Sequence, residues 1–230
     1  MTEAEWLAGE DLERLLRWLE WGMRPERKWQ LFALACLEPL APHIHDERLK
    51  LALSAIARNA EGRGAAAELE SAREDAEAAH DLIWADPSEQ RWFYVSEYAA
   101  RAVTLATQAG YEGHARQIAK FCSETLRLCA DYHTADAVRR EANDRQVSLI
   151  YDIFGNPFRP VALDPLWLTF DVQALAQGID ADRAFDRMPI LADALQDAGC
   201  DNPDVLNHCR DPHATHVRGC WVLDLLLGKG

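Results

Sequence analysis

The sequence predicts an all-α protein: a helical bundle with an alanine-rich antiparallel hairpin, followed by a compact module of short, capped helices. Apolar residues recur at spacings of three and four along most of the chain, and the alternation typical of strands is nearly absent. Glycines and prolines follow these segments where helices are expected to end. The chain has 230 residues, of which 49% are apolar and 27% are charged, as in ordinary globular proteins.

The first sixty residues carry start and stop signals for several helices. Thr2 and Glu5 have the spacing of a capping box, which opens a short helix. A leucine repeat then runs to Gly22, and Pro25 fits the first turn of the next helix. Pro39 ends that helix, and a further helix is expected to run to about residue 60.

The middle of the chain predicts an antiparallel hairpin. Apolar residues between positions 65 and 83 are separated by 4, 3, 4, 3 and 4 residues, and those between 92 and 109 by 3, 4, 3, 4 and 3. Most are alanines, which let two helix backbones approach closely. Residues 86–88 (Asp-Pro-Ser) provide the turn. A third helix begins near Glu112, so residues 1–154 are expected to form a helical bundle.

The composition changes after residue 154. Three prolines lie between Gly155 and Pro165, which predicts a rigid connector. From residue 160 onward there are eleven Asp and no Glu, and Asp favours caps over helix interiors. Asp164, Asn202 and Asp211 each precede a proline, the pattern of a helix N-cap. We therefore expect a C-terminal helical module over residues 155–230, packed on the bundle or continuous with it.

Charge and cysteine content exclude several classes of function. Twenty-four Lys and Arg against thirty-eight Asp and Glu give a net charge of −14, which disfavours nucleic-acid binding. No apolar stretch is long enough for a membrane span, and the first residues do not form a signal peptide. Six cysteines without an export signal indicate reduced thiols and a cytoplasmic location.

One dense cluster of potential metal ligands contains His208, Cys209, His213, His216 and Cys220. On a helix, His216 and Cys220 would lie on one face, four residues apart, and imidazoles with a thiolate suit zinc. His208 and Cys209 are adjacent, so we do not expect both to reach the same ion. In the alternative interpretation no cofactor is bound: Cys209 and Cys220 pack in the core, and the histidines cap turns or face water.

Other candidates favour structural roles. Glu77 and His80 form a single Glu-x-x-His pair that is predicted to face solvent, whereas a di-iron bundle needs two inward-facing pairs. Cys36 lies in one apolar stripe, and Cys122, Cys129 and His133 share another, so core packing is expected there, with a thiol or metal role as the alternative. The sequence has no GxSxG elbow, phosphate loop or dinucleotide fingerprint, so it predicts no catalytic residues.

Tryptophan is unusually abundant near the N-terminus. Trp6, Trp18, Trp21 and Trp29 fall within the first thirty residues, too many for this segment to bury easily. An exposed aromatic cluster there would suit a protein partner. In the alternative interpretation, Trp18 and Trp29 anchor the first helices on the bundle.

Three segments carry a family resemblance: MTEAEWLAGED, IYDIFGNPFRPVALDPLWL, and RAFDRMPILADALQDAGCDNPDVLNHCR with the later HVRGCWVLDLLLGK. They resemble a bacterial family of hypothetical proteins that occurs as paralogues in planctomycete-type genomes. The resemblance is densest over residues 150–229. A second Cys and basic residues commonly follow the position of Cys36 in that family, whereas Leu37 follows it here. The resemblance implies no activity, cofactor or catalytic residue, only many diverged copies, which is more typical of recognition or regulatory modules than of metabolic enzymes.

The sequence therefore favours an intracellular protein-binding, adaptor or regulatory protein without catalytic activity. The alternative is a zinc protein, including a metal-dependent hydrolase, that uses the cluster between residues 208 and 220. A third hypothesis is a structural protein that oligomerises through its heptad seams. The sequence alone does not decide the oligomeric state.

Overall fold

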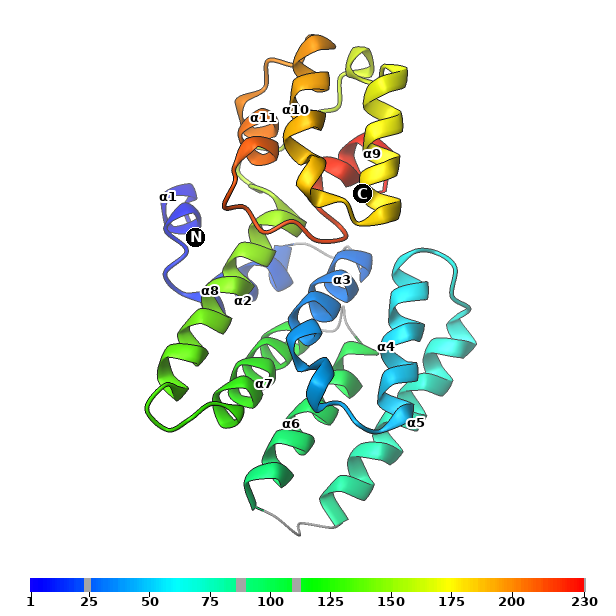
Figure 1. Ribbon diagram of the computed structural model, residues 1–230, viewed down its shortest axis with the longest axis vertical. Coiled ribbons are helices and arrows are strands. Elements are labelled where there is room, and N and C mark those ends of the chain that lie inside the picture. The colour runs from blue at the N-terminus through cyan, green and yellow to red at the C-terminus, as the bar shows by residue number, and fades with distance from the viewer. Residues whose placement is uncertain (23–25, 86–89, 109–112, 230) are drawn as a thin grey trace. The chain divides into compact units, whose positions relative to one another are not determined.

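The computed structural model describes residues 1–22, 26–85, 90–108 and 113–229, without the side chains of residues 90–92. Within these ranges there are twelve α-helices and no strand, so the all-α prediction is confirmed (Figure 1). None of these helices is both long and apolar enough to cross a membrane. Several predicted features lie outside the described residues: Pro25, the turn at 86–88, the seam residue Ala109, Gly110, Glu112 and the side chain of Trp92.

The chain divides into two compact units, Met1–Val147 and Ser148–Gly230. The helices of the first unit are α1 (Glu3–Ala8), α2 (Leu12–Gly22), α3 (Glu26–Leu37), α4 (Glu47–Ala60), α5 (Ala66–Ala85), α6 (Gln90–Ala106) and α7 (His114–Cys129), with a 3-10 helix at Glu38–His43. Helix α8 (Ala135–Phe154) begins in the first unit and ends in the second. The second unit contains α9 (Phe170–Asp182), α10 (Met188–Asp197), α11 (Pro203–Arg210) and α12 (Trp221–Leu227), with 3-10 helices at Pro165–Trp167 and Phe185–Arg187.

In the first unit the predicted capping box is present, and the predicted seam of α5 is buried at its centre, whereas Ala65 is exposed and precedes the helix. Thr2 and Glu5 form both hydrogen bonds of the capping box of α1. The alanines Ala72, Ala76 and Ala79 of α5 are buried, and α5 packs against α6 as expected for the hairpin. Small side chains at these positions allow the close approach of the two helices.

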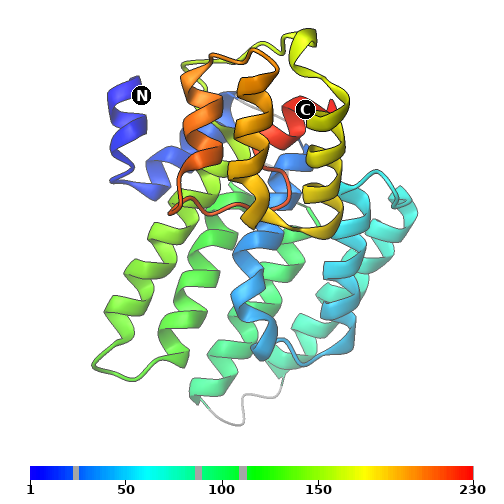
Figure 2. The same cartoon turned by 45° about the horizontal axis from the view of Figure 1, so that its top comes forward.

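In the second unit, short capped helices surround one apolar core. Helix α12 packs against α9 and α11 (Figure 1, Figure 2). Asp164, Thr169 and Asn202 cap the Pro165–Trp167 helix, α9 and α11 respectively through their side chains. The core is formed by these buried side chains: Trp167, Val172, Ala176, Ile179, Met188, Leu191, Ala192, Leu195, Cys200, Val205, Cys209, Cys220, Val222, Leu223 and Leu226.

One prediction about this unit was wrong. Asp211 does not cap a helix: it ends α11, its carboxylate accepts a hydrogen bond from the backbone of His213, and residues 211–220 are irregular. The compact unit begins at Ser148, within α8. The last two turns of α8, which include Leu149 and Ile153, are therefore part of the C-terminal unit.

Candidate metal centre

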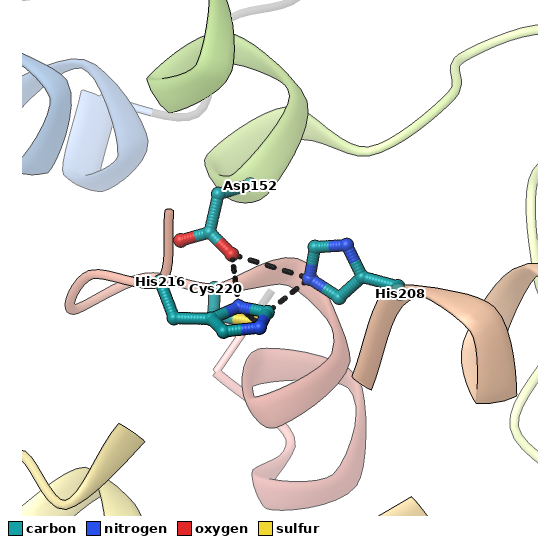
Figure 3. Close-up of side chains that lie close together, drawn as sticks. All are labelled: Asp152, His208, His216 and Cys220. Carbon is teal, nitrogen blue, oxygen red and sulfur yellow. Dashed lines mark hydrogen bonds and ion pairs between the residues drawn. The ribbon is translucent and has the colours of Figure 1, made fainter. Parts of the chain in front are cut away.

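Four potential metal ligands converge inside the second unit (Figure 3). Asp152 comes from the last turn of α8, His208 from α11, His216 from the irregular segment 211–220, and Cys220 from the position just before α12. One ligand atom from each residue can be chosen so that all four atoms lie within 4.8 Å of one another. Three parts of the chain, the end of α8, helix α11 and the segment 211–220, therefore meet at one point.

The individual distances describe a compact arrangement. Oδ1 of Asp152 lies 2.9 Å from Nδ1 of His216 and 3.1 Å from Nε2 of His208. The same Nε2 of His208 lies 3.2 Å from Sγ of Cys220, and this sulfur lies 3.9 Å from Nδ1 of His216. In a tetrahedral zinc site with bonds of 2.0–2.3 Å, neighbouring ligand atoms are about 3.3–3.6 Å apart. The four observed separations thus lie within about half an ångström of that range.

The cluster is largely removed from solvent. The side chains of Asp152, His216 and His208 are 3%, 7% and 15% exposed, and Cys220 is fully buried. The ring of His208 lies against those of His216 and Trp221, with centroids 4.9 and 5.3 Å away. A buried carboxylate, two imidazoles and a thiol are costly unless they are paired or bound to a cation.

Asp152 is the negative centre of the cluster. Burial raises the pKa of its carboxyl, but hydrogen bonds and charge interactions with His208 and His216 outweigh burial, and the pKa is lowered overall. Its second oxygen, Oδ2, accepts a hydrogen bond of 2.8 Å from the backbone N–H of Val217. Asp152 is therefore an ionised carboxylate that holds the 211–220 segment to the end of α8.

Cys220 is a protonated thiol when no cation is bound. Burial and the neighbouring Asp152 carboxylate raise the pKa of this thiol well above its ordinary value. A bound divalent cation would reverse this effect, because metal ligation deprotonates a thiol. The site therefore contains one group whose charge depends on the presence of a metal.

The cluster is chemically suited to zinc. A thiolate and two imidazoles favour zinc over magnesium or calcium, which prefer oxygen ligands. Coordination through Nδ1 of His216 would place the ring proton on Nε2, which is buried and has no hydrogen-bond partner among the described residues. Such an unpaired N–H costs about 1–3 kcal/mol, whereas structural zinc contributes about 10–16 kcal/mol of apparent binding free energy. The residues therefore fit the metal.

The structure brings together three of the five residues suggested by the sequence and separates the other two. Cys209 lies in the apolar core, and His213 is exposed. His208 and Cys209 point to different places, as expected from their adjacency. His216 and Cys220 do converge, but from an irregular segment and not from one helix face.

Asp152 is the potential ligand that the sequence did not reveal. It is 56 positions before His208 along the chain. One signal was available: this single carboxylate interrupts the apolar run around Leu149, Ile150, Ile153 and Phe154, all of which are buried. A carboxylate among buried helix positions requires a partner.

The four N-terminal tryptophans do not form one exposed cluster. Trp6 and Trp29 are buried, so the structure removes them from the predicted partner surface. Trp18 is half-buried and its ring lies 5.8 Å from that of Trp6, whereas Trp21 is 88% exposed. Two buried rings stabilise the first helices, and the exposed aromatic surface is reduced to Trp21 and the edge of Trp18.

His80 also departs from its prediction. It is only half-exposed, and its Nε2 lies 3.3 Å from Oε1 of the buried Glu97 on α6. Arg101 approaches the same oxygen at 3.5 Å. The Glu-x-x-His pattern therefore supplies a partner for a buried carboxylate between α5 and α6. Cys36 and Cys122 are buried, as predicted, whereas Cys129 is only partly buried and His133 is exposed.

Comparisons with family models, curated proteins and solved structures give no match, so the site is interpreted from its own geometry.

Proposed function

We propose that the C-terminal unit is a zinc module in which Asp152, His208, His216 and Cys220 hold one Zn²⁺, within a non-catalytic binding or adaptor protein. The observation that carries this proposal is the convergence of four side chains, one carboxylate, two imidazoles and one thiol, from three parts of the chain in a buried position. A cytoplasmic, reducing location is part of the proposal, because it would keep the Cys220 thiol unoxidised and able to bind a metal.

A structural role is favoured over hydrolysis. A catalytic zinc keeps three protein ligands and an open position for water, whereas a structural zinc is closed by four protein ligands. Here four ligands are available and the most exposed, His208, is only 15% exposed. The ion would crosslink the end of α8, α11 and the start of α12 through the irregular segment between them.

Metal content tests this proposal directly. The full-length protein would be purified without a His tag under reducing conditions, and its metals measured by mass spectrometry. We expect about one zinc per chain in the wild type and a large loss in His216→Ala and Cys220→Ala. His213→Ala is the matched control, because His213 is a nearby histidine outside the cluster, and it should keep its zinc.

Three results would contradict the proposal. One is wild-type protein that takes up no zinc at micromolar free concentration while its circular dichroism shows the expected helices. A second is equal loss of zinc in His213→Ala and His216→Ala. The third comes from cobalt substitution: a cobalt-loaded protein without a thiolate-to-cobalt charge-transfer band would show that Cys220 does not bind the metal.

A second candidate function is recognition of a protein partner by the first unit. Trp18 and Trp21 line a groove of about 450 Å³, together with Met1, Arg14, Arg17 and Glu20. Exposed tryptophan beside arginine is the composition typical of interface anchors. Capture of interacting proteins would compare the wild type with Trp21→Ala, and with Trp84→Ala as a control at another exposed tryptophan. Loss of the same partner in both variants would argue against this groove.

A further inference from the structure

A row of five aromatic rings crosses three helices of the first unit and contains no residue of the metal centre. Helix α6 packs against both α5 and α7, and all three helices contribute to the row (Figure 1). The rings belong to Trp84 of α5, to Phe93, Tyr94 and Tyr98 of α6, and to Phe121 of α7. The centroids of successive rings are 5.6, 5.2, 6.0 and 5.4 Å apart, within the usual range for paired aromatic side chains. The five rings therefore form one continuous feature, the aromatic row.

All five rings of the aromatic row keep solvent-exposed surface. Trp84 is 61% exposed and Tyr94 is 44% exposed, while the other three rings are half-buried. Contiguous exposed apolar surface is typical of interaction sites. Tyr and Trp are enriched at interfaces because each joins a large apolar ring to a polar group. The aromatic row is therefore a candidate docking surface, and it shares no residue with the Trp18–Trp21 groove.

The inclination of the rings favours one shape of ligand. Neighbouring ring planes are inclined to one another by 49°, 68°, 48° and 40°, so the row has no common flat face. Stacked nucleic-acid bases therefore fit poorly, and the net charge of −14 also repels phosphates. Inclined rings leave notches between them, and proline-rich peptides dock on aromatic surfaces of this kind in the polyproline II conformation. Such a peptide is already extended, so it loses little conformational entropy on binding.

We propose that the aromatic row binds a proline-rich segment of a partner protein in the polyproline II conformation, with an acidic residue beside Arg101. The steps between rings correspond to about two residues each at the polyproline II rise of about 3.1 Å, so a peptide of about eight residues spans the row. This proposal goes beyond the zinc module and does not depend on it.

Arg101 supplies the charge at one end of the row. Its guanidinium carbon lies 5.2 Å from the ring centroid of Phe121, the last ring, and its side chain is 50% exposed. Its contact with the buried Glu97 is made through Nη1 at 3.5 Å. A guanidinium has five N–H donors, so donors remain for a carboxylate of the peptide. A lysine at the same position of the peptide would be repelled.

Titration of the full-length protein followed by ¹H–¹⁵N NMR tests the ligand class. The probes are hexaproline peptides with blocked termini that carry Asp, Ser or Lys at both ends, and a Gly-Ser octapeptide. We expect saturable shifts with the Asp-flanked peptide, weaker binding of the Ser-flanked peptide, the weakest binding of the Lys-flanked peptide, and none with Gly-Ser.

Four results would overturn the proposal. No saturable shift with any proline peptide at 10 mM, or equal binding of the Gly-Ser peptide, would exclude polyproline recognition. Saturable binding of cellohexaose in place of the peptides would show that the rings bind sugars. Equal binding of the Lys-flanked and Asp-flanked peptides would refute the acidic end.

Substitutions place the peptide on the row. Tyr94→Ala should weaken binding of the Asp-flanked peptide about tenfold, as for an aromatic interface residue. Tyr132→Ala removes a tyrosine of the same unit that is 92% exposed and outside the row, and it should bind as the wild type does. Equal affinities of these two variants, with unchanged circular dichroism, would show that the peptide does not bind at the row.

A second pair of variants tests the charged end. Arg101→Gln should weaken binding of the Asp-flanked peptide about fivefold, the upper effect of an exposed charge pair, and should remove the preference over the Ser-flanked peptide. Arg63→Gln is the control, because Arg63 is an arginine of the same unit that is 70% exposed and outside the row. A preference that persists in Arg101→Gln would show that Arg101 does not contact the acidic residue.

Discussion

Zinc should raise the stability of the full-length protein by an amount that can be calculated from its affinity. A ligand that binds only the folded state stabilises it by RT ln(1 + [L]/Kd), which is about 2.7 kcal/mol at a free concentration of 100 Kd. For a chain of about 150–250 residues, 1 kcal/mol corresponds to about 2–4 °C in Tm, so the expected increase is about 5–11 °C.

The Cys220→Ser variant tests whether the shift comes from the cluster. It preserves the size of a fully buried side chain while it removes the soft ligand. If binding becomes a hundredfold weaker, the same free zinc concentration gives only about 0.4 kcal/mol of stabilisation. His213→Ala should show the full wild-type shift, because His213 is exposed and outside the cluster.

Thermal unfolding followed by circular dichroism, in zinc-buffered and chelator-containing solutions, measures these shifts. Chelator titration of the same samples gives the Kd used in the calculation. The reasoning would be refuted by a wild-type Tm that does not change with free zinc, because the network of Asp152 with His208, His216 and Val217 would then satisfy the site without a metal. It would also be refuted if Cys220→Ser kept the full shift.

Three further predictions follow from the titratable groups. Zinc affinity should rise about tenfold per pH unit between about pH 7 and 8, because the raised pKa of Cys220 means that binding releases one proton. Competition titrations with a buffered chelator measure this dependence. An affinity that does not change with pH would contradict the prediction. Asp46→Ala should cost about 1 kcal/mol of unfolding free energy near neutral pH, because Asp46 caps α4 through the N–H of Arg48. Hydrogen bonds from Arg48 lower the pKa of Asp46 in the folded protein. The stabilisation by Asp46 is therefore present above the pKa of its unfolded state and is lost as the pH falls through the pKa of the folded state. In urea denaturation, the difference in unfolding free energy between wild type and Asp46→Ala should be smaller at pH 3 than at pH 7. Cys129 is partly exposed, whereas Cys122 is buried and burial raises the pKa of its thiol. A thiol reagent should therefore modify Cys129 before Cys122, as measured by mass spectrometry. Equal labelling rates of the two cysteines would contradict the described core.

The helices could be predicted from the sequence because their signals are local. The capping box of Thr2 and Glu5, the buried alanines of α5 and the N-cap at Asn202 each depend on residues within one or two turns. The same local reasoning failed at Asp211, where an Asp-Pro pair follows a helix end and does not begin a helix. There the backbone at Val217 is held by Asp152, which is distant in sequence, and local propensity does not include such a contact.

The candidate metal centre could be predicted only in part, because its side chains are brought together by tertiary packing. Val205 and Cys209 lie one turn apart on the buried face of α11, so the apolar core determines which way this helix is turned. That orientation places Cys209 in the core. It leaves His208 at the edge of the core, where its ring is part of the cluster with Cys220. The choice between these two adjacent ligands therefore depends on tertiary packing, which residue spacing does not reveal.

The packing around Trp221 helps to hold the side chains of the candidate metal centre in position. Trp221 follows Cys220 directly, and its ring lies 5.3 Å from that of His208. A Cβ atom at Gly155, just after α8, would lie 3.1 Å from the Trp221 ring, so this glycine allows the indole to pack against the end of the helix that carries Asp152. The Trp221 side chain thus contacts His208 and the end of the helix that carries Asp152, and Trp221 itself follows Cys220 in the chain. The same indole thus joins the segments that carry Asp152, His208 and Cys220 to one another through apolar packing.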